Sequence, residues 1–134
     1  MKIPYVNLAN QYLAEKKKLL KIIDSALKSG NYVGGDEVRK FEKNIENFLN
    51  VKHCIALNSG TDALTLGLHA LGVRKGDEVI TTSNSFIAST AVIVHLGAKP
   101  VFVDIGNDQL IDTNKIESSI SKKTKAIMPV HLTG

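Results

Sequence analysis

The residues Asn58-Ser59-Gly60-Thr61-Asp62 have the types and spacing of a small anion-binding turn, because they join a short apolar run to an amphipathic stretch that predicts a helix. The first N–H groups of a helix have no intrahelical acceptor and lie at the positive end of its dipole, so a phosphate there gains hydrogen bonds and a favourable field. Gly60 lets the backbone come close, and the hydroxyls of Ser59 and Thr61 can donate to the same oxygens. The alternative is that Ser59 merely caps the helix.

The turn matches neither G-x-G-x-x-G nor G-x-x-x-x-G-K-[ST], which argues against a dinucleotide or a nucleoside triphosphate and favours a single small phosphate. Phe86 follows the polar run Thr-Thr-Ser-Asn-Ser and begins the next predicted helix. Its ring can therefore project over a ligand at the neighbouring turn and stack on a flat heteroaromatic ring. The alternative is that Phe86 is a core residue.

Other polar residues give weaker signals. His131 is the one histidine at a predicted strand end near the proposed site, and the other three fall in predicted helices or open a predicted strand. The histidines lack metal-ligand spacing and Cys54 lies inside a predicted strand, so we expect no zinc site. Asp104 could hold a ligand or a water molecule, but residues 104–108 have the composition of an ordinary turn, which we favour.

Short apolar runs alternate with helical patterns after Asn50, and this alternation predicts a mostly parallel α/β sheet with flanking helices. The predicted strands are 54–57, 78–81, 100–104 and 126–132, and the predicted helices between them are 61–71, 86–96 and 113–120. Ligands of open α/β sheets bind beyond the carboxyl ends of the strands, which is where the polar residues above fall.

Two amphipathic helices are predicted before the sheet, over residues 12–27 and from Asp36 to about Leu49, joined by a glycine-rich link. The expected organisation is an N-terminal helical segment over residues 1–50 and an incomplete α/β domain over residues 51–134. The domain is expected to be incomplete because its last predicted strand has no following helix.

The amino-acid composition argues against several classes of function for this chain. The net charge of +4 over 134 residues is mild and the lysines are mostly dispersed, which argues against nucleic-acid binding. The single cysteine fits a reducing compartment. No apolar run approaches the roughly 20 residues that cross a bilayer, and the N-terminus lacks a signal-peptide core, so we expect no membrane association and a cytoplasmic location.

The order of these features resembles the start of the DegT/StrS-type nucleotide-sugar aminotransferases, which are pyridoxal-phosphate (PLP) enzymes of the aspartate-aminotransferase fold (fold type I). The resemblance runs over essentially the whole chain, and its specificity comes from the order of eight segments. These are Ile3-Pro4-Tyr5-Val6-Asn7-Leu8, residues 29–35, Phe41-Glu42, residues 58–64, Ala70-Leu71-Gly72, residues 76–81, residues 97–104 and residues 124–131.

The resemblance implies roles for particular residues. The family's turn matching Gly60-Thr61-Asp62 holds the cofactor phosphate, and the aromatic matching Phe86 stacks on the pyridine ring. The link around Tyr32, like the extreme N-terminus, lies near the sugar-nucleotide site in relatives, and we include Tyr32 and His131 as candidate substrate-binding residues. Family members are homodimers with active sites at the subunit interface.

The resemblance also implies what these 134 residues lack. The family's Schiff-base lysine, the aspartate at the pyridine nitrogen and a phosphate-binding serine come after the equivalent of Gly134, so no catalytic residue is assigned and we expect no transaminase activity from this chain alone.

The leading hypothesis is the N-terminal portion of an aminotransferase that converts a keto-sugar nucleotide to an amino sugar, with glutamate as donor, for surface polysaccharide synthesis. One alternative is a related PLP-dependent sugar dehydratase, in which histidine replaces the lysine. The other is a non-catalytic module that binds phosphate or associates with a full-length relative.

Overall fold

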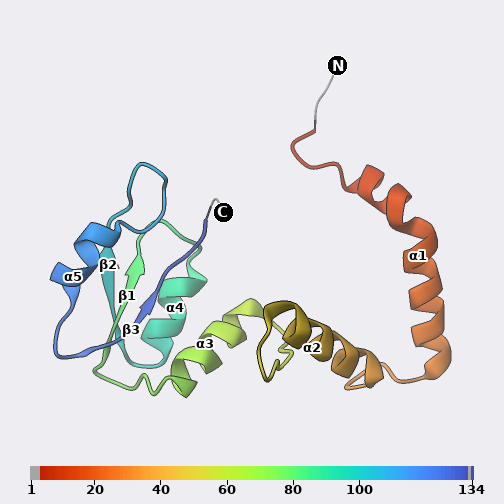
Figure 1. Ribbon diagram of the computed structural model, residues 1–134, viewed down its shortest axis with the longest axis horizontal. Coiled ribbons are helices and arrows are strands. Elements are labelled where there is room, and N and C mark those ends of the chain that lie inside the picture. The colour runs from red at the N-terminus through yellow and green to blue at the C-terminus, as the bar shows by residue number, and fades with distance from the viewer. Residues whose placement is uncertain (1–3, 133) are drawn as a thin grey trace. The chain divides into compact units, whose positions relative to one another are not determined.

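The computed structural model describes residues 4–132 and residue 134 of the chain (Figure 1). Ile3, the first residue of the resemblance, lies outside the described residues. The chain divides into two compact units, residues 1–56 and residues 57–134. The sequence-based expectation put the division six residues earlier, after residue 50.

The first unit contains two helices, α1 (Leu8–Ser29) and α2 (Asp36–Leu49), as predicted. Helix α1 begins four residues earlier than its apolar spacing indicates, because the Asn7 side chain accepts a hydrogen bond from the Asn10 N–H at 3.1 Å and so caps the helix. It ends where Gly30 adopts a left-handed conformation, with φ of 69°.

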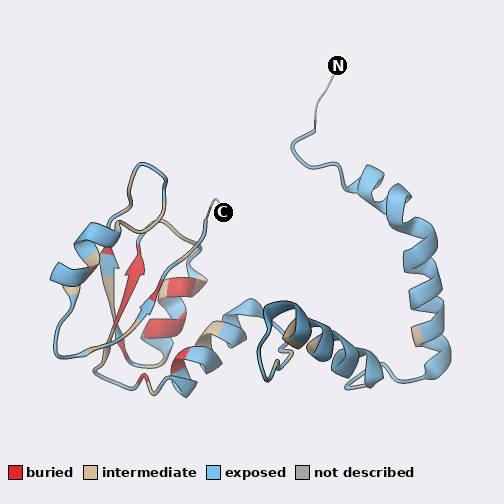
Figure 2. Ribbon diagram, in the orientation of Figure 1, coloured by how far each residue is buried: buried red, intermediate tan, exposed pale blue. Residues whose placement is uncertain are grey.

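Neither helix of the first unit buries a residue (Figure 2). The apolar stripe of α1 that predicted an amphipathic helix remains exposed, with Leu20 and Ile23 each about half accessible. Helical periodicity therefore predicted the helices correctly. Periodicity alone does not specify what covers an apolar face.

The second unit is a three-stranded parallel sheet of order β2-β1-β3 with flanking helices, in agreement with the predicted fold class. Its elements are α3 (Gly60–Ala70), β1 (Glu78–Thr82), α4 (Ala88–His95), β2 (Lys99–Val103), the 3₁₀ turn η1 (Thr113–Lys115), α5 (Ile116–Ser119) and β3 (Thr124–Met128).

The core of this unit lies between the central strand β1 and the helices α3 and α4, where Figure 2 shows most of the buried residues. Val79 and Ile80 are both fully buried, but only Val79 belongs to the cluster packed with α3 and α4. Successive strand residues point to opposite faces, so β1 is covered on both of them. Only Val79 and Ile80 of β1 are apolar, and the two threonines that follow them, Thr81 and Thr82, are buried as well.

The predicted strand over residues 54–57 is wrong, because this segment pairs with no other described strand. Two of its backbone N–H groups instead donate to carboxylates of α2, from Cys54 to Glu46 at 3.2 Å and from Ala56 to Glu42 at 2.8 Å. A strand forms when its backbone groups bond to the backbone of a neighbouring strand. Within the described residues, these two N–H groups bond to side chains instead.

Several other predicted boundaries also differ. The predicted helix over residues 113–120 is a 3₁₀ turn, η1, followed by the short helix α5. Strand β3 ends at Met128 rather than at residue 132, and Pro129, which has no N–H to donate, follows it directly. Helix α4 begins at Ala88, two residues after the predicted start at Phe86. None of the described helices is long and apolar enough to cross a membrane.

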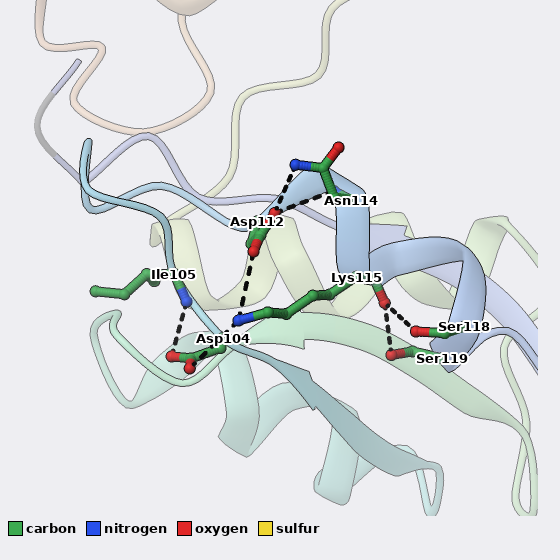
Figure 3. A network of polar contacts seen from close by, with 7 residues as sticks. All are labelled: Asp104, Ile105, Asp112, Asn114, Lys115, Ser118 and Ser119. Atoms are coloured by element: carbon green, nitrogen blue, oxygen red, sulfur yellow. Dashed lines mark hydrogen bonds and ion pairs between the residues drawn. The ribbon is translucent and has the colours of Figure 1, made fainter.

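The loop after β2 is held by the polar network drawn in Figure 3. The Lys115 Nζ atom lies 3.7 Å from Asp104 Oδ2 and 3.4 Å from Asp112 Oδ2. An antiparallel bridge between Ile105 and Ile111 brings the two sides of the loop together. Asp104 also accepts a hydrogen bond from the Ile105 N–H at 2.9 Å, so the structure uses it to hold the turn that its sequence favours.

Candidate functional site

The N-terminus of α3 is formed by a sharp change of backbone direction at Gly60. Ser59 is extended, with φ of −152° and ψ of 155°, and the helix begins at the next residue. The Ser59 Oγ accepts a hydrogen bond from the Asp62 N–H at 3.1 Å, and its hydroxyl donates to Asp62 Oδ2 at 2.9 Å. Ser59 therefore caps the helix, as the alternative interpretation proposed, and its hydroxyl hydrogen is already used within the protein.

Two backbone donors remain at this helix start. Within the described part of the chain, the N–H groups of Gly60 and Thr61 donate to no protein acceptor, as expected for the first residues of a helix. A side chain added at Gly60 would meet nothing within 4 Å, so the space beside this backbone is open. An anion can therefore approach both N–H groups along the helix axis, where the dipole favours it.

Phe86 lies beside the start of α3. It lines an open pocket of about 510 Å³ together with Gly60, Thr61, Leu64, Ala88 and Ser89. The Phe86 side chain is 73% exposed, so it is not a core residue. Its carbonyl accepts a hydrogen bond from the Ser89 N–H at 3.1 Å, which ties Phe86 to the first turn of α4.

The pocket contains no charged side chain among its lining residues. Its attraction for an anion would therefore come from backbone donors and the dipole of α3, while the Phe86 ring and the apolar side chain of Leu64 offer a surface for a flat ring. Leu64 and Ser89 were not predicted from the sequence. Their spacing gave a signal, because Leu64 lies one turn after Gly60 and Ser89 lies three residues after Phe86.

The remaining predicted residues do not line this pocket. Asp62 lines a neighbouring cavity of about 280 Å³ with Thr65 and His95. His131 is exposed beyond the end of β3. Tyr32 belongs to the first unit, where it is 70% exposed and its hydroxyl donates to the Leu27 carbonyl at 3.2 Å.

The carboxyl ends of β1 and β3 are tied together by one side chain. The Thr81 hydroxyl, fully buried, donates to the Met128 carbonyl at 2.9 Å. The strand order places β2 and β3 on opposite sides of β1, so the chain reverses its winding direction at β1. In open α/β sheets, this switch point at the carboxyl ends is where ligands bind.

The second unit is thus an α/β fold with a parallel sheet, in which the N-terminus of a helix and an exposed aromatic ring share one open pocket. Comparison with known proteins identifies the family to which the chain belongs. The model of the DegT/DnrJ/EryC1/StrS aminotransferase family matches residues 13–134, and the chain belongs to this family.

Individual relatives support the same assignment. The chain is 42% identical to a "pleiotropic regulatory protein" of Geobacillus stearothermophilus, over all of this chain and 36% of that protein. It is 41% identical to the UDP-2-acetamido-2-deoxy-3-oxo-D-glucuronate aminotransferase of Pseudomonas aeruginosa, over 98% of this chain and 37% of the enzyme.

A solved structure extends the comparison to the cofactor. The structure of NtdA from Bacillus subtilis with bound pyridoxamine phosphate (PMP) matches 98% of this chain and 31% of its own, with a TM-score of 0.90 and 38% identity. This confirms that the fold is the N-terminal part of a fold type I aminotransferase. The chain spans about one third of the length of these relatives.

Proposed function

We propose that these residues form the N-terminal part of a PLP-dependent aminotransferase that converts a keto-sugar nucleotide to an amino-sugar nucleotide, with glutamate as amino donor. The pocket that unites the start of α3 with Phe86 carries the proposal. The named activities of relatives such as the UDP-2-acetamido-2-deoxy-3-oxo-D-glucuronate aminotransferase supply the substrate class, and surface polysaccharide synthesis is the proposed context.

The residues of the pocket fit the cofactor. A phosphate group needs convergent donors, and the unpaired N–H groups of Gly60 and Thr61 supply them, with the Thr61 hydroxyl beside them. A pyridine ring needs an exposed flat surface, and the Phe86 ring offers one on the same pocket. The Ser59 hydroxyl, which is engaged with Asp62, would act by keeping the helix start in place.

When bound, the cofactor supplies an electron sink for the carbon that gains or loses the amino group. The residues of this chain would bind and orient it through its phosphate and its ring. Transamination also needs a lysine that bonds to the cofactor and moves the proton, and the resemblance assigns that role to none of the lysines here. We therefore expect these 134 residues alone to transfer no amino group from glutamate to a keto-sugar nucleotide.

PMP binding tests the proposal directly. PMP is the preferred probe because its amine, unlike the aldehyde of PLP, does not react with surface lysines. Equilibrium dialysis should show saturable binding of PMP that excess inorganic phosphate displaces. A chain that binds no PMP at millimolar concentration would contradict the proposal and favour a module that acts by association alone.

Gly60 allows one backbone donor to be removed. Proline is tolerated at the first residue of a helix and requires an extended residue before it, which Ser59 already is. Gly60→Pro should therefore weaken PMP binding by roughly tenfold through loss of one N–H, as expected for a hydrogen bond to a charged group. Gly60→Ala keeps that N–H and places its methyl group in open space, so it should bind as the unmodified chain does.

The dehydratase alternative differs in a later step. Both activities use the same phosphate and ring contacts, so PMP binding does not separate them. A protein containing this segment together with the remaining two thirds of the family's length separates them by product: an amino sugar supports the proposal, and a deoxysugar without nitrogen favours the dehydratase.

A further inference from the structure

Ser89 is the most deeply buried polar residue on the pocket that Phe86 shares with the start of α3. Two residues with side-chain hydroxyls line this pocket, Thr61 and Ser89. Thr61 is exposed and Phe86 is 73% exposed, whereas Ser89 is only 6% exposed. Ser89 therefore lies at the floor of the pocket, and Thr61 and Phe86 lie at its rim. All three residues belong to the second compact unit.

The Ser89 hydroxyl has no partner within the part of the chain that the structure describes. The backbone of Ser89 is held, since its N–H donates to the Phe86 carbonyl at 3.1 Å, but its Oγ atom makes no hydrogen bond to a described residue. Each described side-chain nitrogen or oxygen atom that is sealed from solvent does have a partner. The Ser89 Oγ atom is therefore not sealed, and the pocket is the opening that Ser89 lines.

A hydroxyl at this position brings no benefit to the fold. A buried hydroxyl without a partner is unfavourable, because it loses hydrogen bonds to water and gains none from the protein. Helix α4 begins without a side-chain cap, so the Ser89 hydroxyl does not serve the helix start either. Alanine would avoid the unpaired hydroxyl and is the better helix former. A ligand group inside the pocket would supply the missing partner.

The position of Ser89 indicates which part of the cofactor it would meet. The charged phosphate would lie at the rim, where the N–H groups of Gly60 and Thr61 have no protein acceptor among the described residues. The bond from the Ser89 N–H to the Phe86 carbonyl keeps Ser89 within one turn of the stacking ring. A cofactor held at both points would turn an edge of its pyridine ring toward the floor.

We propose that the Ser89 hydroxyl forms a hydrogen bond with a polar atom on the edge of the pyridine ring, and so makes the pocket prefer a heteroaromatic ring to a plain aromatic one. The ring carries a nitrogen and a 3-hydroxyl, and a serine hydroxyl both donates and accepts, so it suits either atom. Phe86 alone gives no such preference, because any flat ring stacks on it. The proposal rests on the proposed function, because it assumes that the pocket binds PLP or PMP.

The test compares two ligands that share a phosphate and a flat ring. PMP has the ring nitrogen and the ring hydroxyl, and benzyl phosphate has neither. Equilibrium dialysis measures PMP affinity, and displacement of PMP measures the weaker binding of benzyl phosphate. Ser89→Ala removes the hydroxyl. Thr90→Val is the matched control, because Thr90 is the next residue of α4, does not line the pocket and keeps its shape when its hydroxyl is replaced by a methyl group.

We expect the unmodified chain to bind PMP more tightly than benzyl phosphate. Ser89→Ala should weaken PMP binding by about fivefold, the effect of losing one hydrogen bond, and leave the affinity for benzyl phosphate unchanged. Its melting temperature should not fall, because the hydroxyl has no partner among the described residues of the chain. Thr90→Val should match the unmodified chain in its affinity for both ligands.

The outcomes separate the two proposals. Unchanged PMP affinity in Ser89→Ala would overturn the inference while the proposed function stands. An equal loss of affinity for PMP and benzyl phosphate would overturn it too, since the hydroxyl would then act on the phosphate. A lower melting temperature of Ser89→Ala would contradict its premise, because it would assign the hydroxyl a structural role. If the unmodified chain binds no PMP, the proposed function itself fails, whatever the melting temperatures show.

Discussion

Ser59 and Asp62 form a reciprocal pair at the start of α3, because the Ser59 hydroxyl both accepts from the Asp62 N–H and donates to the Asp62 carboxylate. The pair satisfies one of the free donors of the helix and leaves those of Gly60 and Thr61 for a ligand. It also keeps the Asp62 carboxylate bonded to Ser59 at the start of the helix.

Removing this cap should destabilise the second unit. Ser59→Ala leaves the Asp62 N–H without its acceptor, and we expect the free energy of unfolding to fall by about 1 kcal/mol. Urea unfolding followed by circular dichroism measures the change. Ser83→Ala is the control, because Ser83 is exposed and lies outside the helices and strands. An unchanged midpoint for Ser59→Ala would show that the cap contributes nothing to stability.

Replacing Phe86 tests the ring contact separately from the phosphate contact. Phe86→Ala should weaken PMP binding by roughly tenfold, and Phe86→Tyr should retain it, because tyrosine offers the same flat surface. Phe102→Ala is a matched control, since Phe102 is another exposed phenylalanine of the same unit and does not line the pocket. Equal PMP affinity for Phe86→Ala and the unmodified chain would argue against stacking.

Replacing Thr81 should lower the free energy of unfolding more than the small size of its side chain implies. Thr81→Val keeps the shape of the side chain but removes the donor to the Met128 carbonyl, and we expect a loss of about 1–3 kcal/mol in the free energy of unfolding. Thr81→Ser retains the hydroxyl and should lose less. Thermal unfolding of the three proteins measures this order, and the reverse order would assign the role of Thr81 to its methyl group.

The carboxylate of Glu46 should titrate below its ordinary range. The Lys43 ammonium, which donates to this carboxylate, is the largest cause of the lowered pKa, and the Cys54 N–H and the charge of His53 act in the same direction. A folded-state pKa below the unfolded one means that the stabilisation is present above the ordinary pKa and is lost as pH falls through the lowered value.

Lys43→Gln tests this electrostatic assignment. It should raise the Glu46 pKa toward its ordinary value, as measured by nuclear magnetic resonance titration of the side-chain carboxyl carbon. Lys40→Gln is the matched control, because Lys40 pairs with Glu37 instead. An unchanged Glu46 pKa in Lys43→Gln would assign the lowering to the backbone contact with Cys54.

Replacing Asp112 in the network of Figure 3 should lower the stability of the protein more than replacing Lys115. Asp112 Oδ1 accepts from the Asn114 N–H at 3.1 Å, and this contact is the largest cause of its lowered pKa. Asp112→Ala should therefore lower stability more than Lys115→Met, whose ion pairs are half exposed and screened by solvent. Urea midpoints of both variants test the order, and a larger loss for Lys115→Met would contradict it.

The sequence by itself determined the elements with local signals. Helical periodicity predicted α1, α2 and α3, and apolar runs between helices predicted the three parallel strands. The cofactor-site residues were chosen on the same basis, since an anion site at a helix start is encoded by a few consecutive residues. The structure places Gly60, Thr61 and Phe86 on one pocket.

Tertiary structure decided what depends on residues distant in the sequence. The segment over residues 54–57 has the composition of a strand, but its backbone donors meet the carboxylates of Glu42 and Glu46, which no local pattern links to it. Hydrogen-bond partners are set by which groups the fold brings within reach, whereas the propensity to extend or coil is set by each residue and its neighbours.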